Sequence, residues 1–100
     1  MEEFKLSIYL PAQIDLLDIV GHLNTMSPEA AVQSYELLTG KLETLAKAPD
    51  RCPLVRDTQL KLRGYRTLHI GSYVVFLVIS GNTVEIRRVL FSRRQYEWML

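Results

Sequence analysis

The sequence predicts an α+β domain. In this domain an N-terminal strand and an antiparallel helical hairpin pack on a mostly antiparallel sheet that ends in a three-strand meander. Across residues 12–48, apolar residues recur at steps of three and four, the period of helices with one buried side. Residues 62–91 hold three strand-like segments separated by glycine-containing turns too short for crossover connections. A chain of 100 residues is expected to form a single domain over residues 1–100.

The first two elements follow from their apolar spacing. A strand is expected over residues 4–9, because Phe4, Leu6 and Ile8 alternate with polar residues, and Pro11 ends it. A helix is expected over about residues 12–24, with an apolar stripe on one side and polar side chains on the other. The stripe consists of Leu16, Ile19, Val20 and Leu23, and the polar side consists of Asp15, Asp18 and His22.

The start of the second helix is marked by its capping residues. Ser27 suits the N-cap, Pro28 suits the first turn, and Glu29 complements the helix dipole. The apolar pattern continues to residue 47 or 48, and the short link at residues 25–26 makes the two helices an antiparallel hairpin. Tyr35 is interpreted as a core residue, and so is Trp98.

The remainder of the chain is expected to be an irregular segment, three strands and a terminal helix. The irregular segment spans residues 49–61, the strands span residues 62–70, 73–79 and 83–91, and the helix spans residues 93–100. The middle strand is apolar on both faces, whereas antiparallel sheets usually expose one polar face. Its second face therefore needs a cover, which the terminal helix, the irregular segment or a partner chain could supply.

Charge is distributed unevenly along the chain. The net charge is +1, but residues 1–50 carry a net charge of −5 and residues 51–100 a net charge of +6. This asymmetry predicts a basic surface that suits a nucleic-acid backbone or an acidic partner; alternatively, the two halves neutralise each other across the fold.

Several protein classes and site types are not expected. The acidic start Met1-Glu2-Glu3 is unlike a secretory signal, and no apolar run is long enough to cross a membrane, so a cytoplasmic protein is expected. Cys52 is the only cysteine, and His22 and His69 lie far apart, so neither a disulfide nor a metal site is expected. No cofactor-binding motif is present.

The candidate site residues come from the basic second half. Lys61, Arg63 and Tyr65 alternate on a predicted strand and are expected to share a face. Arg87 is expected to point away from the core, whereas Arg88 breaks the alternation and predicts a bulge or an inward-facing charge near Arg66. The remaining candidates, Arg93, Arg94 and Tyr96, follow the last strand.

Catalysis, if it occurs, has to rely on these side chains. The usual nucleophile and carboxylate-pair motifs are absent. Arginine, lysine and tyrosine suit RNA cleavage, because cations stabilise the phosphorane-like transition state and a perturbed lysine or tyrosine can move protons. His69 could serve as a general acid or base, although a strand-bound structural role is favoured. Whether the protein is an enzyme stays open at this point.

Four segments, in this order along the chain, resemble the RelE/ParE toxins. They are Pro53-Leu54-Val55-Arg56-Asp57, Arg63-Gly64-Tyr65-Arg66, Gly71-Ser72-Tyr73-Val74-Val75-Phe76 and Val84-Glu85-Ile86-Arg87-Arg88-Val89-Leu90-Phe91-Ser92-Arg93-Arg94. The resemblance covers nearly all the chain and implies the same fold. It also implies the toxin of a type II toxin–antitoxin (plasmid stabilisation) system, neutralised by a cognate antitoxin protein and requiring no cofactor.

The resemblance implies two different targets. RelE-like members are endoribonucleases that cleave ribosome-bound mRNA, and ParE-like members inhibit DNA gyrase. Ribonuclease members place an arginine where this chain has Val74, so gyrase inhibition is favoured over mRNA cleavage. A member that has lost toxicity and only binds its partner is the third alternative.

Site residues are assigned accordingly. The resemblance implies catalytic roles for Arg93, Arg94 and Tyr96. Arg66 is expected to join them by replacing the charge that is missing at Val74. The assignment to target binding is Lys61, Arg63, Arg87 and Arg88.

Overall fold

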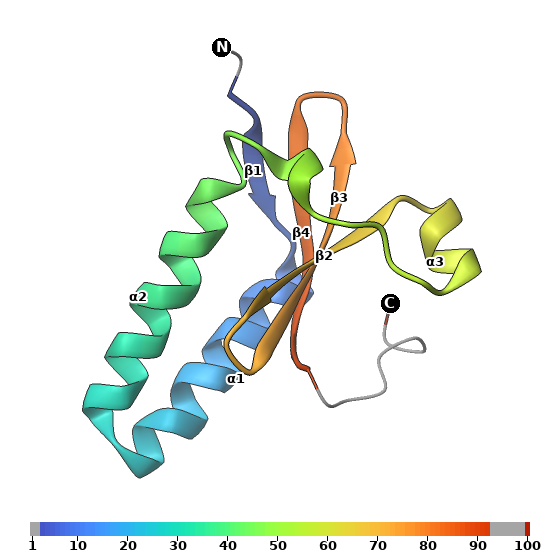
Figure 1. Cartoon of the computed structure of the whole chain (residues 1–100). Helices are drawn as coiled ribbons and strands as arrows, with labels where there is room; N and C mark the ends of the chain where they lie inside the picture. Colours follow the sequence, from blue (N-terminus) through green and yellow to red (C-terminus); the bar gives the residue numbers. More distant parts are fainter. Residues whose placement is uncertain (1–2, 93–99) are drawn as a thin grey trace.

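The computed structural model describes residues 3–92 and Leu100 and confirms the predicted α+β architecture (Figure 1). One strand and two helices come first, followed by a short 3₁₀ helix (Pro49–Arg51), a one-turn helix and three strands. The elements are β1 (Lys5–Ile8), α1 (Leu10–Met26), α2 (Pro28–Thr44), α3 (Thr58–Leu62), β2 (Tyr65–Ile70), β3 (Tyr73–Ser80) and β4 (Thr83–Phe91).

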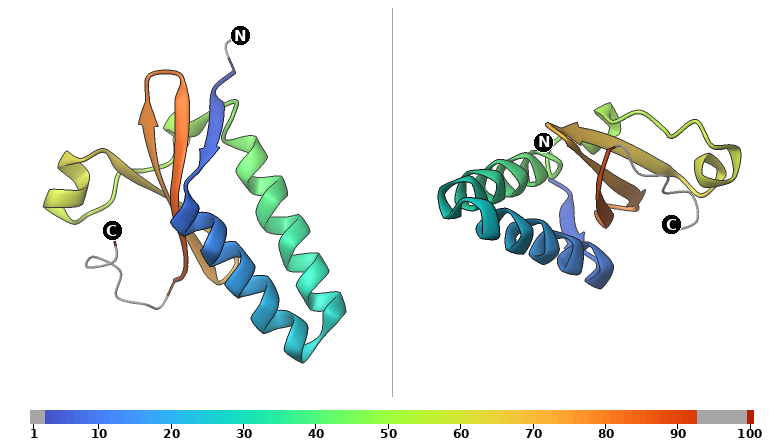
Figure 2. Two further views of the ribbon diagram at one scale, coloured as in Figure 1. Left: turned by 180° about the vertical axis from the view of Figure 1, so that it is seen from behind. Right: turned by 90° about the horizontal axis from the view of Figure 1, so that it is seen from below.

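The four strands form one sheet in the order β1-β4-β3-β2. β1 runs parallel to β4, whereas the β2–β3 and β3–β4 pairs are antiparallel and form the predicted meander. Gly71 and Gly81 adopt φ values of 57° and 60° in the two hairpin turns, a region that glycine enters without steric cost. Helices α1 and α2 lie on one side of the sheet, and the segment that carries α3 lies on the other (Figure 2).

The helix-covered face holds the larger core. α1 and α2 contribute the buried residues Ala12, Leu16, Leu38 and Leu42, and the sheet contributes Ile70, Val75, Leu77, Val84, Ile86 and Val89. Phe4, Leu6 and Ile8 pack against this core, as their alternation predicts.

The helical hairpin is longer at its start and tighter at its turn than expected. α1 begins at Leu10, so Pro11 lies in its first turn, a position where proline loses no hydrogen bond. Only Ser27 separates the two helices, and its Oγ accepts the N–H of Ala30 at 3.2 Å, which confirms it as the N-cap. α2 ends at Thr44, three or four residues before the expected end at residue 47 or 48.

The prediction that Tyr35 is a core residue is wrong, because its side chain is 50% exposed. The buried residues of α2 are Ala31, Leu38 and Leu42. Leu38 and Leu42 belong to the helix-covered core, and Tyr35 does not. Trp98 lies outside the described residues.

The start of β2 also differs from the expectation. Residues 58–62 form α3 rather than irregular chain and strand, because Asp57 Oδ1 caps the helix by accepting the N–H of Leu60 at 3.0 Å. Arg63 ends α3, and Gly64, with φ at 83°, turns the chain into the sheet. β2 therefore begins at Tyr65, and Lys61 and Arg63 are not strand residues.

The second face of β3 is covered by the segment between α2 and β2. Val55 and Leu60 from this segment pack on Phe76 and Val74, together with Tyr65 and Leu90 from the neighbouring strands. Hydrogen bonds from Val55 N to Tyr65 O and from Thr67 N to Pro53 O fasten the segment to the outer edge of β2. Of the three possible covers, the segment before β2 therefore lies on this face. Residues 53–62 form the covering segment. The expected terminal helix lies outside the described residues except for Leu100, which packs on the same face.

Candidate functional site on the loop-covered face

A β-bulge in β4 determines which side chains reach each face of the sheet. Leu77 of β3 pairs with Ile86 while Phe76 pairs with Arg88, so Arg87 is the extra residue. Before the bulge, Val84 and Ile86 face the helices; after it, Val89 does, and Leu90 faces the other way. The break in alternation at Arg88 predicted this bulge, and the structure confirms it.

The side chain of Arg88 is held by a carboxylate from α1. Its Nε and Nη2 donate to Asp15 Oδ2 and Oδ1 at 2.7 and 2.8 Å. Asp15 Oδ2 also accepts the N–H of Val89 at 2.9 Å, next to the bulge. The hydrogen bond to Asp15 raises the pKa of Arg88, so the guanidinium stays charged. The predicted inward-facing charge is therefore present, but its neighbour is Asp15 and not Arg66.

The placement of Asp15 corrects the sequence interpretation. Asp15 was expected on the exposed side of α1, but only 8% of its surface is exposed, so it is buried. It lies three residues after Ala12 and four before Ile19, both of which contact the core. This spacing was the available signal, because it places position 15 on the buried side of the helix.

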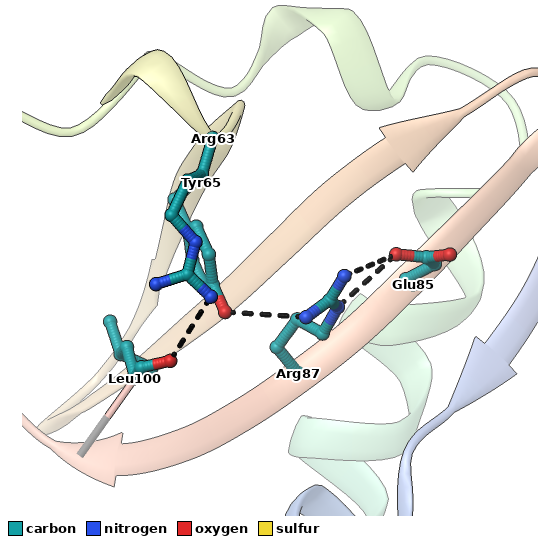
Figure 3. Close-up of polar contacts among 5 residues, drawn as sticks. All are labelled: Arg63, Tyr65, Glu85, Arg87 and Leu100. Atoms are coloured by element: carbon teal, nitrogen blue, oxygen red, sulfur yellow. Dashed lines mark hydrogen bonds and ion pairs between the residues drawn. The ribbon is translucent and has the colours of Figure 1, made fainter. Parts of the chain in front are cut away.

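At the bulge, two arginines and two tyrosines stack on the loop-covered face of the sheet. Figure 3 shows three of these residues, Arg63, Tyr65 and Arg87. The Cζ atom of Arg87 lies 4.6 Å from the ring centroid of Tyr9 and 5.7 Å from that of Tyr65, and Arg63 Cζ lies 5.1 Å from the Tyr65 centroid. These distances are typical of cation–π contacts. These four residues, with Glu85, form the arginine–tyrosine cluster.

Glu85 neutralises one of the two arginines. Its Oε1 accepts from Arg87 Nη2 at 2.8 Å and from Nε at 3.1 Å, while Arg87 Nη1 donates to the hydroxyl of Tyr65 at 3.4 Å. The hydrogen bond from Arg87 holds the pKa of Glu85 below its ordinary value. The hydrogen bond to Glu85 is the main cause of a raised pKa at Tyr9, and desolvation is the second cause. The Tyr9 hydroxyl therefore acts as a hydrogen-bond donor and not as a base.

Arg63 is the accessible cation of the cluster. It is exposed, it stacks on the buried ring of Tyr65, and its Nη2 donates to the backbone carbonyl of Leu100 at 3.4 Å. Since Glu85 balances Arg87, Arg63 leaves the cluster with one positive charge in excess. A stacked guanidinium with free donors suits a carboxylate or a phosphate.

A cleft of about 720 Å³ lies on the same face, between the covering segment and the far ends of β2 and β3. Val74, only 2% exposed, lines it together with His69 and Thr67 from β2. The other lining residues are Pro53, Leu54, Val55, Arg56, Asp57 and Ser92. The position next to Tyr73 therefore offers the cleft an apolar surface and no cation.

The other predicted site residues are not gathered at one point. Arg66 Nη1 donates to the carbonyl oxygens of Cys52 and Asp50 at 2.6 and 3.2 Å, so this guanidinium anchors the chain just before the covering segment. Lys61 is exposed on α3. The structure brings together Arg63 and Arg87, which the sequence placed on one surface, while Arg93, Arg94 and Tyr96 lie outside the described residues.

Sequence reasoning missed the roles of Tyr9 and Glu85. Tyr9 follows the polar positions Lys5 and Ser7 in the alternation of β1, and Glu85 alternates with Val84 and Ile86 in β4. Both were therefore assignable to the polar face, but their contact depends on the parallel pairing of β1 with β4, which has no local sequence signal.

Residues 3–92 and Leu100 contain neither a metal site nor a membrane-spanning helix. No three His, Cys, Asp or Glu side chains in this part of the chain are placed to hold a metal ion together. None of its helices has the length and apolar character required to cross a bilayer.

Two of three comparisons with known proteins lead to toxin–antitoxin proteins. The family model described as ParE toxin of type II toxin–antitoxin system, parDE, matches residues 8–96. A search of curated proteins found no significant match. Among solved structures, the chromosomal ParDE toxin–antitoxin system of P. aeruginosa matches with a TM-score of 0.75 and 20% identity, over 89% of this chain and 96% of that one. The RelBE2 toxin–antitoxin complex of Mycobacterium tuberculosis matches with a TM-score of 0.62 and 22% identity, over 89% and 98%. At these identities the two structures establish a shared fold.

Proposed function

Because the chain belongs to the family of ParE toxins of type II toxin–antitoxin systems, we propose that it inhibits DNA gyrase in the cytoplasm and that a cognate antitoxin protein neutralises it. The observation that carries the choice of target is Val74. Ribonuclease members of the related RelE group place an arginine at this position, whereas Val74 is buried against Phe76 and lines the cleft as an apolar surface. A transition state with a doubly charged phosphate would find no cation there.

The contacts of Arg66 support the same choice. A neighbouring arginine could replace the missing charge only if its guanidinium reached the cleft. Arg66 instead donates to the backbone carbonyls of Asp50 and Cys52, just before the covering segment and on the opposite side of β2 from His69. Its contribution is therefore to position the loop.

A polypeptide partner is supported by the surface around the cleft. The cleft combines apolar Val74 and Val55 with the charged Arg56, and Arg63 presents donors close to the same face. An extended segment with alternating apolar and acidic residues would match it. The similar solved structures come from toxin–antitoxin systems, which also favours an antitoxin as the partner.

Lys61 and Arg63 are the described residues that we propose for contact with the target, with Arg93 and Arg94 as further contributors. Lys61 and Arg63 are exposed, whereas Arg87 is held by Glu85 and Arg88 by Asp15. A Lys61→Ala/Arg63→Ala variant is expected to lose toxicity while keeping its stability. The matched control is Lys41→Ala/Lys47→Ala, which removes two exposed lysines near the end of α2.

Cleavage of mRNA is the second candidate, favoured by one observation. His69 is exposed in the cleft, which Arg56 also lines, so a titratable group and a cation share one surface. The catalytic set would then be His69 with Arg93, Arg94 and Tyr96. Arg66 would not belong to it, because its guanidinium is directed away from the cleft.

Induction of the chain with and without the adjacent reading frame distinguishes the candidates. Gyrase inhibition predicts loss of supercoiling activity, rescued by the antitoxin, and intact mRNA by primer extension. Codon-linked mRNA breaks with unaffected gyrase would replace the proposal by the ribonuclease reading, and unimpaired growth would identify a member that is no longer toxic.

A further inference from the structure

A small pocket lies against the arginine–tyrosine cluster. Its volume is about 140 Å³. Since one molecule of liquid water takes up about 30 Å³, this space holds a group of a few heavy atoms. The pocket is lined by Tyr9, Pro11, Tyr65, Arg87, Arg88 and Leu100. Guanidinium groups and hydroxyls therefore adjoin apolar side chains, which is typical of a site that binds a polar group of a larger ligand.

The buried hydroxyl of Tyr65 offers a hydrogen-bond donor at this pocket. Tyr65 is 2% exposed, and its hydroxyl oxygen accepts from Arg87 Nη1 at 3.4 Å. Among the residues that the structure describes, none accepts the hydroxyl proton in return. A tyrosine hydroxyl can donate and accept at the same time, and a buried one usually finds a partner. The missing partner of Tyr65 is therefore an acceptor.

Arg63 adds further donors beside the same hydroxyl. Its Cζ atom lies 5.1 Å from the centroid of the Tyr65 ring, and Figure 3 shows the Tyr65 hydroxyl between Arg63 and Arg87. A guanidinium carries several N–H donors, and in the described chain Arg63 uses one of them, to the carbonyl oxygen of Leu100 at 3.4 Å. Charge-assisted hydrogen bonds are about 2.7–2.9 Å long, so this contact is weak. A charged oxygen at a shorter distance would bind Arg63 more strongly.

The charges around the pocket favour a carboxylate over a phosphate. Glu85 balances Arg87, and Asp15 balances Arg88, so Arg63 leaves one positive charge in excess among the described residues. One carboxylate matches this charge. A phosphate monoester carries about −1.5 to −2 charges at pH 7 and would meet the negative charge of Glu85. A nucleic-acid phosphate carries one charge but is flanked by two sugars, for which about 140 Å³ leaves no room.

We propose that this pocket binds the carboxylate of an aspartate or glutamate side chain of a protein partner. Arg63 and the hydroxyl of Tyr65 donate to the carboxylate oxygens, and the carbonyl of Leu100 moves away from Arg63. Arg87 stays on Glu85 and holds the Tyr65 hydroxyl in place. That the carboxylate comes from the target or from the antitoxin rests on the proposed function, whereas the binding of a carboxylate does not.

NMR titration of the full chain with sodium acetate, at constant ionic strength, tests the site without any partner. Cell-free synthesis avoids toxicity during production. The Nε–H resonance of Arg87 and the amide resonance of Gly64 are expected to shift and to saturate, with tighter binding of acetate than of inorganic phosphate. Arg63→Gln and Tyr65→Phe each remove a donor and should raise the midpoint about tenfold or more, because hydrogen bonds to charged groups are strong. Tyr65→Phe keeps the ring that packs in the smaller core.

The matched controls are Arg51→Gln and Tyr35→Phe, which make the same changes at exposed positions outside the pocket. Both should keep the wild-type midpoint, and spectra without acetate check that every variant folds. Shifts that never saturate, phosphate that binds more tightly than acetate, or a wild-type midpoint in Arg63→Gln and Tyr65→Phe would overturn the proposal.

Growth assays distinguish the two sources of the carboxylate. If the target supplies it, the induced Arg63→Gln/Tyr65→Phe double variant should be less toxic than the wild type. If the antitoxin supplies it, this variant should stay toxic but escape rescue by the adjacent reading frame. Arg51→Gln/Tyr35→Phe should match the wild type in both respects. A double variant of the pocket that is fully toxic and fully rescued would show that no protein partner uses it. Saturable acetate binding by a chain that leaves gyrase unaffected would instead contradict the proposed target alone.

Discussion

A single carboxylate, Asp15, connects the first helix to the last strand. Its two oxygens accept from Nε and Nη2 of Arg88 and from the N–H of Val89, which ties a guanidinium and a backbone amide beside the bulge to α1. The side chains of Arg88 and Asp15 are 20% and 9% exposed, so water replaces little of this contact if it is lost. A buried charge without its partner is costly, and this makes Asp15 a residue on which the fold depends.

Asp15→Asn is expected to lower the free energy of unfolding by about 2–3 kcal/mol, somewhat less than for a fully buried pair because Arg88 keeps some solvent contact. Urea denaturation measures the change. Asp18→Asn, an exposed position on the same helix, is the control and is expected to change stability by less than about 0.5 kcal/mol. Equal effects of the two variants would show that the ion pair contributes no stability.

The ion pair of Glu85 predicts a pH dependence. The hydrogen bond from Arg87 lowers the pKa of Glu85 in the folded chain, so the ionised form stabilises the fold. This stabilisation is fully present above the ordinary glutamate value of about 4.3 and is lost as the pH falls through the lower folded value. The difference in unfolding free energy between wild type and Glu85→Gln should therefore be constant near neutral pH and shrink in acid. Glu36→Gln, exposed on α2, supplies the baseline, and a difference that grows in acid would contradict the assignment.

Among the features of the secondary-structure elements, the bulge in β4 has the largest effect on the structure. One extra residue moves the helix-facing positions from Val84 and Ile86 to Val89, and sends Leu90 into the smaller core. Without it, strict alternation would direct Leu90 toward the helices and Val89 away from them.

Deletion of Arg87 is therefore expected to abolish folding, whereas Arg87→Ala, which keeps the extra backbone residue, is expected to cost about 1–2 kcal/mol through lost contacts to Glu85 and Tyr9. Thermal unfolding followed by circular dichroism separates the two variants. A deletion variant that melts like Arg87→Ala would show that β4 tolerates the other register.

The elements with strong local signals were predictable, and those that depend on distant contacts were not. The capping residue Ser27, the turn glycines and the broken alternation at Arg88 each act within a few residues. α3 is one turn long and is held by its cap and by the packing of Leu60 on the sheet, so no periodicity reveals it. The contact of Tyr9 with Arg87 requires the parallel pairing of the chain's first and last strands, which local spacing does not encode.

In the molecule as a whole, one sheet separates two hydrophobic cores that differ in how much secondary structure covers them. The helix-covered core is closed by two helices of 17 residues each. The smaller core is closed by residues 53–62, which contribute Val55 and Leu60 and few backbone hydrogen bonds to the sheet. Segments with few buried contacts open at lower free energy than the rest of a domain. The covering segment should therefore open without unfolding the helices, which would give a binding partner access to Val74 and Phe76.

Leu60→Ala tests this unequal stability. The substitution removes a buried side chain, 4% exposed, from the smaller core and should lower the free energy of opening by about 2 kcal/mol, which is about thirtyfold in exchange rate. Hydrogen exchange measured by NMR should therefore accelerate at the amides of Val55 and Thr67, which bond the segment to β2, and remain unchanged at the amide of Leu45 at the end of α2. Leu62→Ala, 83% exposed on the same short helix, should alter neither. Equal acceleration at all three amides would mean that the two cores unfold as one unit and that the loop-covered face opens only when the whole chain does.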